Sequence, residues 1–308
     1  MHIVVLLQRQ FVYRYTSIII IYILIFIFIA IPTFSVSLPL SSDYGCQCVV
    51  FRIDDIQDYW IEKASIAAMD LFISKNLTLS VGLIIHDIGN DTILTEKIEE
   101  GLDRNLFELA LHGWDHEDFT TFYLQQQKDL LKKANEKNQI LFGNKSQVFT
   151  PPYDQFNNNT LKAMNDLNIK ILSSSLQAEN DFNEGKDIFN LKVKMINSGS
   201  VSDSIYHLPS TVSFYDYEDD NRTKESLQDI LNKVDDSISK YGYSVITFHA
   251  QDFAKLDEEG EFIDIVDIEQ IEDLSLLIDT LKLKNISASS FSGIVDLKSS
   301  NELENYIK

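Results

Sequence analysis

The chain has 308 residues, 44% of them hydrophobic, and a formal net charge of −21 at pH 7. This is enough for one large domain or two small ones with a substantial core. The negative charge argues against nucleic acid or an anionic lipid surface as the main partner. After residue 45 no long linker, repeat or low-complexity segment occurs, so we expect a single domain over residues 45–308.

The first 44 residues differ from the rest of the chain. Arg9 and Arg14 precede an uncharged apolar run, and Ile18–Val36 has about the length that a helix needs to cross a bilayer. A basic flank, an apolar run and small residues after it are typical of an export signal or an N-terminal membrane anchor. Both interpretations predict an extracellular or cell-surface protein, held at the membrane if the segment is not cleaved.

Two further features agree with export and a glycoprotein. Six Asn-x-Ser/Thr sequons occur, at Asn76, Asn90, Asn144, Asn158, Asn221 and Asn285. The two cysteines, Cys46 and Cys48, form a C-x-C pair. A disulfide within such a pair is expected to be strained, so we expect Cys48 to be a small apolar core residue instead.

Short apolar runs alternate with segments of helical period along the remaining chain. The predicted strands are Val49–Ile53, Leu77–Ile85, Leu106–Leu111, Gln147–Phe149, Ile169–Ser174, Ile205–Leu208, Tyr243–Phe248 and Ile286–Phe291. The predicted helices are Tyr59–Lys75, Thr92–Arg104, Thr120–Phe142, Asn157–Leu167, Thr223–Lys240 and Asp264–Lys284. Such α/β alternation predicts a parallel sheet covered by helices, and seven or eight strands favour a distorted (β/α)7-8 barrel. No G-x-G-x-x-G follows the first strand, which leaves a nucleotide-binding fold without support.

Active sites of (β/α) barrels lie where the strands end at their C-terminal edge. Unusual polar residues occur at four such ends of the predicted strands: Asp54-Asp55, His112 with His116, Thr150 to Asp154, and His249. One carboxylate and two imidazoles are a sufficient ligand set for zinc or a similar divalent ion, with a position left open for water or substrate. A bound cation would also neutralise one of the two adjacent aspartates, and the other carboxylate could act as a base.

Each of these features also has an ordinary structural interpretation. Adjacent aspartates are more often solvated or cap a helix, H-x-x-x-H is more often chance or helix surface, and a late histidine such as His249 is more often a hydrogen-bonded wall residue. Pro151-Pro152 after a strand is usually a stiff turn. The joint occurrence of all four features, in order and at successive strand ends, favours a functional site.

In this order the motifs resemble those of the polysaccharide deacetylase superfamily. The superfamily's T-F-D-D-G reads "FRIDDIQ" here, its H-[ST]-x-x-H reads "HGWDH", its R-P-P-Y reads "TPPY" and its L-x-x-H reads "ITFH". The resemblance spans about residues 48–291. It implies a single catalytic domain with a divalent ion, expected to be zinc, at the mouth of the barrel.

The resemblance also implies a role for each matching residue. Asp55, His112 and His116 would bind the metal, and Asp54 would be the general base. His249 would be the general acid, and the backbone N–H of Tyr153 would hold the oxyanion. Trp114, Pro152 and Tyr153 are expected to contact substrate.

The chain departs from the superfamily pattern at several positions, which indicates a divergent branch. Thr150 replaces the arginine that orients the base, Gly113 replaces Ser or Thr, and Ile56-Gln57 follow Asp-Asp in place of Gly. The superfamily's fourth motif, whose acid tunes the catalytic histidine, is not evident, and Asp252 is a local candidate for it.

Three hypotheses follow. The first is a metal-dependent hydrolase that removes acetyl groups from a cell-surface or extracellular polysaccharide or glycan. The second is a catalytically degenerate barrel that keeps the metal and binds glycan without turnover. The third is an amidohydrolase that acts on a non-sugar C–N bond.

Overall fold

The computed structural model describes residues 46–175, 192–194, 204–216 and 222–297. The predicted N-terminal hydrophobic segment, the proposed boundary at residue 44 and the sequon at Asn221 lie outside these residues. Within them, no helix combines the length and apolar character that crossing a membrane requires.

The centre of the fold is one curved, mostly parallel sheet. Its strands follow the order β6-β7-β5-β4-β3-β2-β1-β11-β8, and β14 pairs with the first residues of β1. Every pair in this sheet is parallel except β6 with β7. The strands are β1 (Cys48–Ile56), β2 (Leu79–Leu83), β3 (Phe107–Leu111), β4 (Val148–Phe149), β5 (Ile171–Leu172), β6 (Lys192–Lys194), β7 (Ser204–His207), β8 (Val212–Ser213), β11 (Tyr243–His249) and β14 (Ser287–Ser289). The predicted distorted (β/α) barrel is confirmed.

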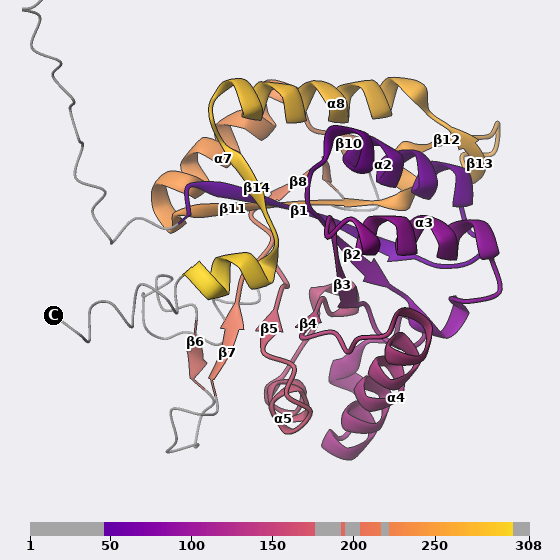
Figure 1. Ribbon diagram of the computed structural model, residues 1–308, viewed down its shortest axis with the longest axis vertical. Helices are drawn as coiled ribbons and strands as arrows, with labels where there is room; N and C mark the ends of the chain where they lie inside the picture. The colour runs from indigo at the N-terminus through magenta and orange to yellow at the C-terminus, as the bar shows by residue number, and fades with distance from the viewer. Residues whose placement is uncertain (1–45, 176–191, 195–203, 217–221, 298–308) are drawn as a thin grey trace, which may run out of the picture. The chain divides into compact units, whose positions relative to one another are not determined.

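Helices cover the outer face of this sheet (Figure 1). They are α2 (Glu62–Lys75), α3 (Thr92–Asp103), α4 (Leu124–Phe142), α5 (Asn158–Asp166), α7 (Leu227–Tyr241) and α8 (Ile268–Leu283). Neighbouring helices contact one another in the pairs α4–α5, α2–α3, α2–α8 and α7–α8. The order of the helices therefore follows the order of the strands that they connect.

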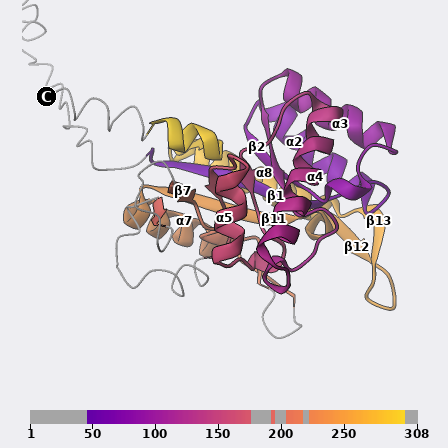
Figure 2. The same cartoon turned by 90° about the horizontal axis from the view of Figure 1, so that it is seen from below.

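Two small hairpins lie outside the main sheet. Strand β9 (Tyr215–Asp216) pairs with β10 (Thr223–Lys224), and β12 (Ala254–Leu256) pairs with β13 (Phe262–Val266). The β12–β13 hairpin packs against α2 (Figure 2). The predicted helix from Asp264 was therefore wrong over its first residues: they pair with β12, and α8 begins at Ile268 after the Asp267 cap.

Strand β1 is buried on both faces, and its alternation sorts the side chains into two groups. Val49, Phe51 and Ile53 belong to the apolar core that includes α2, and the ring of Phe51 lies 5.1 Å from that of Phe72. Cys48 and Val50 belong to a second cluster with β3, β4 and β11 residues. Because side chains of a strand alternate, Arg52 and Asp54 lie on the same face as Cys48 and Val50.

Cys46 and Cys48 form a disulfide, contrary to the sequence-based expectation. Gln47, between them, has a φ of 51°, and this left-handed turn brings the two Cα atoms to 5.1 Å, within the usual range for a disulfide. Cys48 is also buried, as predicted.

Candidate active site

A cavity of about 870 Å³ lies at the C-terminal edge of the sheet. It is lined by residues from the ends of several strands, among them Asp54 and Asp55 from β1, His112 after β3, and His249 at the end of β11. These residues therefore lie at the edge of the sheet where the active sites of (β/α) barrels are found.

Three side chains in this cavity have the arrangement of a metal site. The Nε2 atoms of His112 and His116 lie 3.1 Å and 3.2 Å from Oδ1 of Asp55. These donor atoms all lie within 4.8 Å of one another, and Asp55 Oδ1 is buried without a hydrogen-bond partner among the described residues. Burial opposes ionisation of Asp55, but the adjacent imidazoles of His112 and His116 hold its pKa well below the usual value.

The orientation of His112 fits a metal ligand. Its Nδ1 lies 2.7 Å from the carbonyl oxygen of Thr150 and 3.1 Å from the Thr150 hydroxyl. A proton on Nδ1 is therefore donated to Thr150, and the lone pair of Nε2 is directed toward Asp55 and His116. Metal-binding histidines are commonly fixed by such a bond from their second nitrogen, so this donor set fits a divalent ion.

His249 lies beside the buried carboxylate of Asp252. Asp252 Oδ2 accepts a hydrogen bond from the His249 backbone N–H at 2.8 Å and lies 3.8 Å from the imidazole Nδ1. Arg222 reaches Oδ1 of the same carboxylate at 3.4 Å. Burial lowers the pKa of His249, but Asp252 outweighs this effect and raises that pKa to about 9.

A family model described as polysaccharide deacetylase matches residues 38–172. The match includes the described strand ends that carry Asp54-Asp55, His112, His116 and Tyr153, and these side chains meet in one cavity. Over residues 38–172 the chain is similar to the polysaccharide deacetylase family. His249 lies beyond the matched residues, and the fold places it in the same cavity.

Solved structures with the fold of this superfamily domain are similar over most of the chain. A carbohydrate esterase family 4 domain of a xylanase from the hindgut metagenome of Trinervitermes trinervoides has 14% identity and a TM-score of 0.51, over 82% of this chain and 91% of its own. An acetyl xylan esterase from Clostridium thermocellum, solved with a cobalt ion, has 12% identity and a TM-score of 0.51, over 82% and 92%. A family 4 pseudoenzyme from Bacillus anthracis has 13% identity and a TM-score of 0.51, over 82% and 66%. No curated protein matches the sequence.

The superfamily's base-orienting arginine has no counterpart at Thr150, but an arginine reaches the same aspartate from β1. Arg52 donates a hydrogen bond from Nη2 to Oδ2 of Asp54. Both side chains are almost completely buried. Burial raises the pKa of Asp54, but the Arg52 guanidinium outweighs this effect and holds that pKa below its ordinary value. Sequence reasoning missed Arg52, although its spacing of two from Asp54 on a strand placed both on one face.

Of the three residues predicted to contact substrate, only Tyr153 lines the cavity. Tyr153 is 63% exposed, and its ring lies 4.7 Å from that of His116. Pro152 is buried, and Trp114 is packed against the core with Lys133 Nζ 3.7 Å from its ring centre. Neither Pro152 nor Trp114 is among the described residues that line the cavity.

Several site residues have left-handed backbone conformations that are uncommon outside glycine. The φ values are 63° at Asp55, 56° at His116 and 56° at Tyr153. Such conformations persist where the surrounding structure enforces them, and they concentrate at functional sites. Asp55 lies inside β1, where the register with β2 shifts, whereas His116 and Tyr153 lie in the segments that follow β3 and β4. All three side chains line the cavity.

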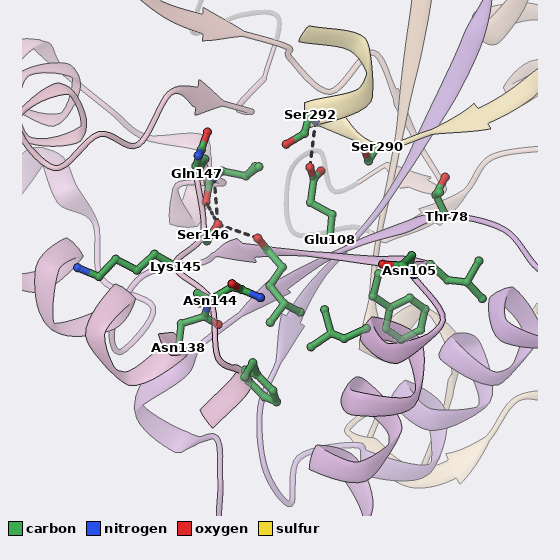
Figure 3. A pocket seen from close by; sticks show the side chains of 16 residues that line it. Thr78, Asn105, Glu108, Asn138, Asn144, Lys145, Ser146, Gln147, Ser290 and Ser292 are labelled. Carbon is green, nitrogen blue, oxygen red and sulfur yellow. Dashed lines mark hydrogen bonds between the residues drawn. The ribbon is translucent and has the colours of Figure 1, made fainter. Parts of the chain in front are cut away.

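Two other features of the described residues are weaker candidates. His86, Asp87 and Asp115 form a second cluster of metal-ligand type, but it is solvent-exposed. A second cavity, of about 500 Å³, lies where β2, β3 and β4 begin (Figure 3). The acid in it, Glu108, accepts hydrogen bonds from the backbone N–H groups of Phe291 and Ser292 at the start of a helical segment over 291–297. Glu108 therefore has a structural partner already.

Proposed function

We propose that the protein is a metal-dependent hydrolase that removes acetyl groups from an extracellular or cell-surface carbohydrate. The observation that carries this proposal is the meeting of Asp55, His112 and His116 in a cavity that also contains Asp54 and His249. Zinc is the expected ion, because two imidazoles and one carboxylate are ligands it commonly takes, with further positions left open.

A divalent ion held by Asp55, His112 and His116 would supply the Lewis acidity that activates water and the acetyl carbonyl. Asp54, next to the ligand Asp55, accepts the proton of the attacking water. Its lowered pKa keeps it ionised and ready for this step at neutral pH. The backbone N–H of Tyr153 donates to the oxygen on which negative charge develops.

His249 then completes the reaction as the general acid. Its pKa of about 9 keeps the imidazole protonated at neutral pH. The proton passes to the leaving amine if the substrate is an N-acetyl sugar, or to the leaving alcohol if it is an O-acetyl ester. The products are acetate and the deacetylated sugar.

Three features support a carbohydrate substrate met outside the cell. Hydroxyl side chains line one wall of the cavity, from Ser210, Thr211, Ser213 and Thr247, and the exposed ring of Tyr153 offers a surface on which a sugar can stack. The Cys46–Cys48 disulfide is of a kind that persists in oxidising compartments. The basic and apolar N-terminal segment provides the route of export, with membrane attachment if it is retained.

The test is acetate release by the zinc-loaded full-length chain from chitin oligomers, acetylated xylan and cell-wall material. We expect release from at least one of these, and a loss of about 100-fold or more in Asp54→Asn. Asp103→Asn, which removes an exposed carboxylate at the end of α3, is the matched control and should keep full activity. No acetate from any substrate, or equal activity in Asp54→Asn, would contradict the proposal.

A second candidate is a metal-containing glycan-binding protein without turnover. The similarity to a pseudoenzyme from Bacillus anthracis, at the same TM-score as to the esterase from Clostridium thermocellum, favours considering it. It predicts binding to a glycan array that survives Asp54→Asn and yields no product. Acetate release from a non-sugar amide, with none from carbohydrate, would instead point to an amidohydrolase.

A further inference from the structure

Arg52 sits within the sheet at a position where a charge requires a specific partner. It is 2% exposed, on the face of β1 that also carries Asp54, and β1 is flanked by β2 and β11 at this level. A buried guanidinium is costly unless it is paired and hydrogen-bonded. The partners of the guanidinium therefore indicate the role of this residue.

Those contacts come from three segments, because Asp154 Oδ1, in the turn after β4, also lies 3.7 Å from Nη2. Nη2 donates to Asp54 Oδ2, and Nη1 donates to the backbone carbonyl of Ser173 at 3.2 Å and to the Ser173 hydroxyl at 3.3 Å. Ser173 directly follows β5, so the arginine is anchored across the inside of the barrel. One oxygen of Asp54 is thereby fixed, while Arg52 and Asp54 both line the cavity.

The position that carries arginine in the superfamily pattern has a different task in this chain. Thr150 is fully buried, and its carbonyl and hydroxyl oxygens are the partners of His112 Nδ1. A threonine there supplies no charge to Asp54. The only arginine guanidinium that the described residues place on Asp54 is that of Arg52.

We infer that Arg52 is the positioning residue for Asp54, supplying from β1 the support that Thr150 lacks. The inference rests on the proposed function in one respect: Asp54 is the base whose orientation matters. Arg52 acts through Asp54 and does not itself contact the reacting atoms. The arginine that the superfamily pattern places at position 150 is then replaced by Arg52 on β1, which donates a hydrogen bond to Asp54.

The test compares Arg52→Lys and Arg52→Met with the wild type, all zinc-loaded and full-length. We expect kcat to fall about 100-fold in Arg52→Met, because a displacement of about 1 Å at a catalytic group can cost that much. KM should change less than threefold, and the metal content should stay at that of the wild type. Arg52→Lys keeps the charge without the fork geometry and should recover part of the loss. Arg104→Met, at an exposed arginine beyond α3, is the control and should leave kcat unchanged.

Crystal structures of zinc-loaded wild type and Arg52→Met give a readout that does not require activity. We expect the Asp54 carboxylate to rotate away from its wild-type position in the variant. A kcat within threefold of wild type in both variants, or an unmoved Asp54, would overturn the inference. If wild type releases no acetate, the proposed function fails, and the position of Asp54 in the two structures still decides the role of Arg52. If Arg52→Met does not fold, Arg52→Lys and Ser173→Ala are compared in the same two measurements.

Discussion

Oδ2 of Asp252 contacts both the backbone and the side chain of His249: it accepts the His249 backbone N–H at 2.8 Å and lies 3.8 Å from Nδ1 of the imidazole. The two residues are three apart in a short helical turn that follows β11. A completely buried acid thus sits directly behind the proposed general acid. We propose that Asp252 takes the task of the superfamily's fourth motif, close in sequence to the histidine it tunes.

Asp252→Asn is expected to shift the alkaline limit of activity to lower pH. Burial already lowers the pKa of His249, and Asp252 is the main group that raises it to about 9. A general acid works only while protonated, so activity is lost as pH rises through this pKa. Removing the negative charge should lower the limit by about 1 to 3 pH units. The measurement is kcat/KM against pH; an unchanged alkaline limb in a folded variant would contradict the assignment of His249.

Much of the site could be predicted because it depends on a general property of parallel sheets. The C-terminal ends of neighbouring parallel strands lie at one edge of the sheet. Asp55, His112 and His116 were therefore expected to lie close together. Strand alternation also contained the information for Arg52, since residues two apart on β1 share a face. The superfamily pattern places the arginine at the position of Thr150, so the pattern itself does not point to Arg52.

Other features depend on long-range or conformational effects that a local pattern does not contain. The Cys46–Cys48 disulfide needs the left-handed turn at Gln47. The residues before α8 have apolar side chains compatible with a helix, and their pairing with Ala254–Leu256 makes them a strand. The packing of Trp114 under Lys133 likewise depends on where α4 lies, so its absence from the cavity wall could not be predicted.

One divalent ion per chain is expected to bind, and His112→Ala should abolish this binding. His86→Ala removes a histidine from the exposed cluster with Asp87 and Asp115, and should keep the ion. Elemental analysis of the full-length protein after gel filtration measures both. Metal retained in His112→Ala, or lost in His86→Ala, would place the metal site elsewhere.

Metal binding should release protons and weaken as the pH falls. Burial lowers the pKa of His112, but the nearby carboxylates of Asp54 and Asp55 raise it above its ordinary value in the metal-free protein. A protonated imidazole cannot bind a metal, so the ion must displace this proton. Calorimetric titration in buffers of different ionisation enthalpy gives the number of protons released. At pH 6 we expect more protons to be released per bound ion than at pH 8, and a lower affinity for the ion.

Cys46→Ser and Cys48→Ser are expected to lose different amounts of stability, although both remove the same disulfide. The bridge closes a very short loop, so its loss should lower the free energy of unfolding by only about 1 to 2 kcal/mol in Cys46→Ser. Cys48 is 1% exposed, and a serine hydroxyl there adds the cost of burying a polar group, about 1 to 3 kcal/mol more. Denaturant unfolding of both variants measures the difference. Equal losses of stability would show that the bridge alone accounts for the effect.

Gly82 of β2 leaves the space that Asp54 occupies, and Gly82→Ala is expected to impair catalysis without removing the metal. A Cβ atom at this position would overlap Oδ1 of Asp54 and approach its Cγ at 3.2 Å. The surrounding strands are buried, so the carboxylate must turn away, and a displacement of about 1 Å would lower kcat about 100-fold. Gly143→Ala is the control: its added Cβ meets nothing within 4 Å, but its φ of 83° makes the alanine strained, at about 1 to 2 kcal/mol. That variant should lose stability and keep its kcat, whereas Gly82→Ala should lose kcat at unchanged metal content. A Gly82→Ala protein with wild-type kcat would mean that the position of Asp54 is not critical to the reaction.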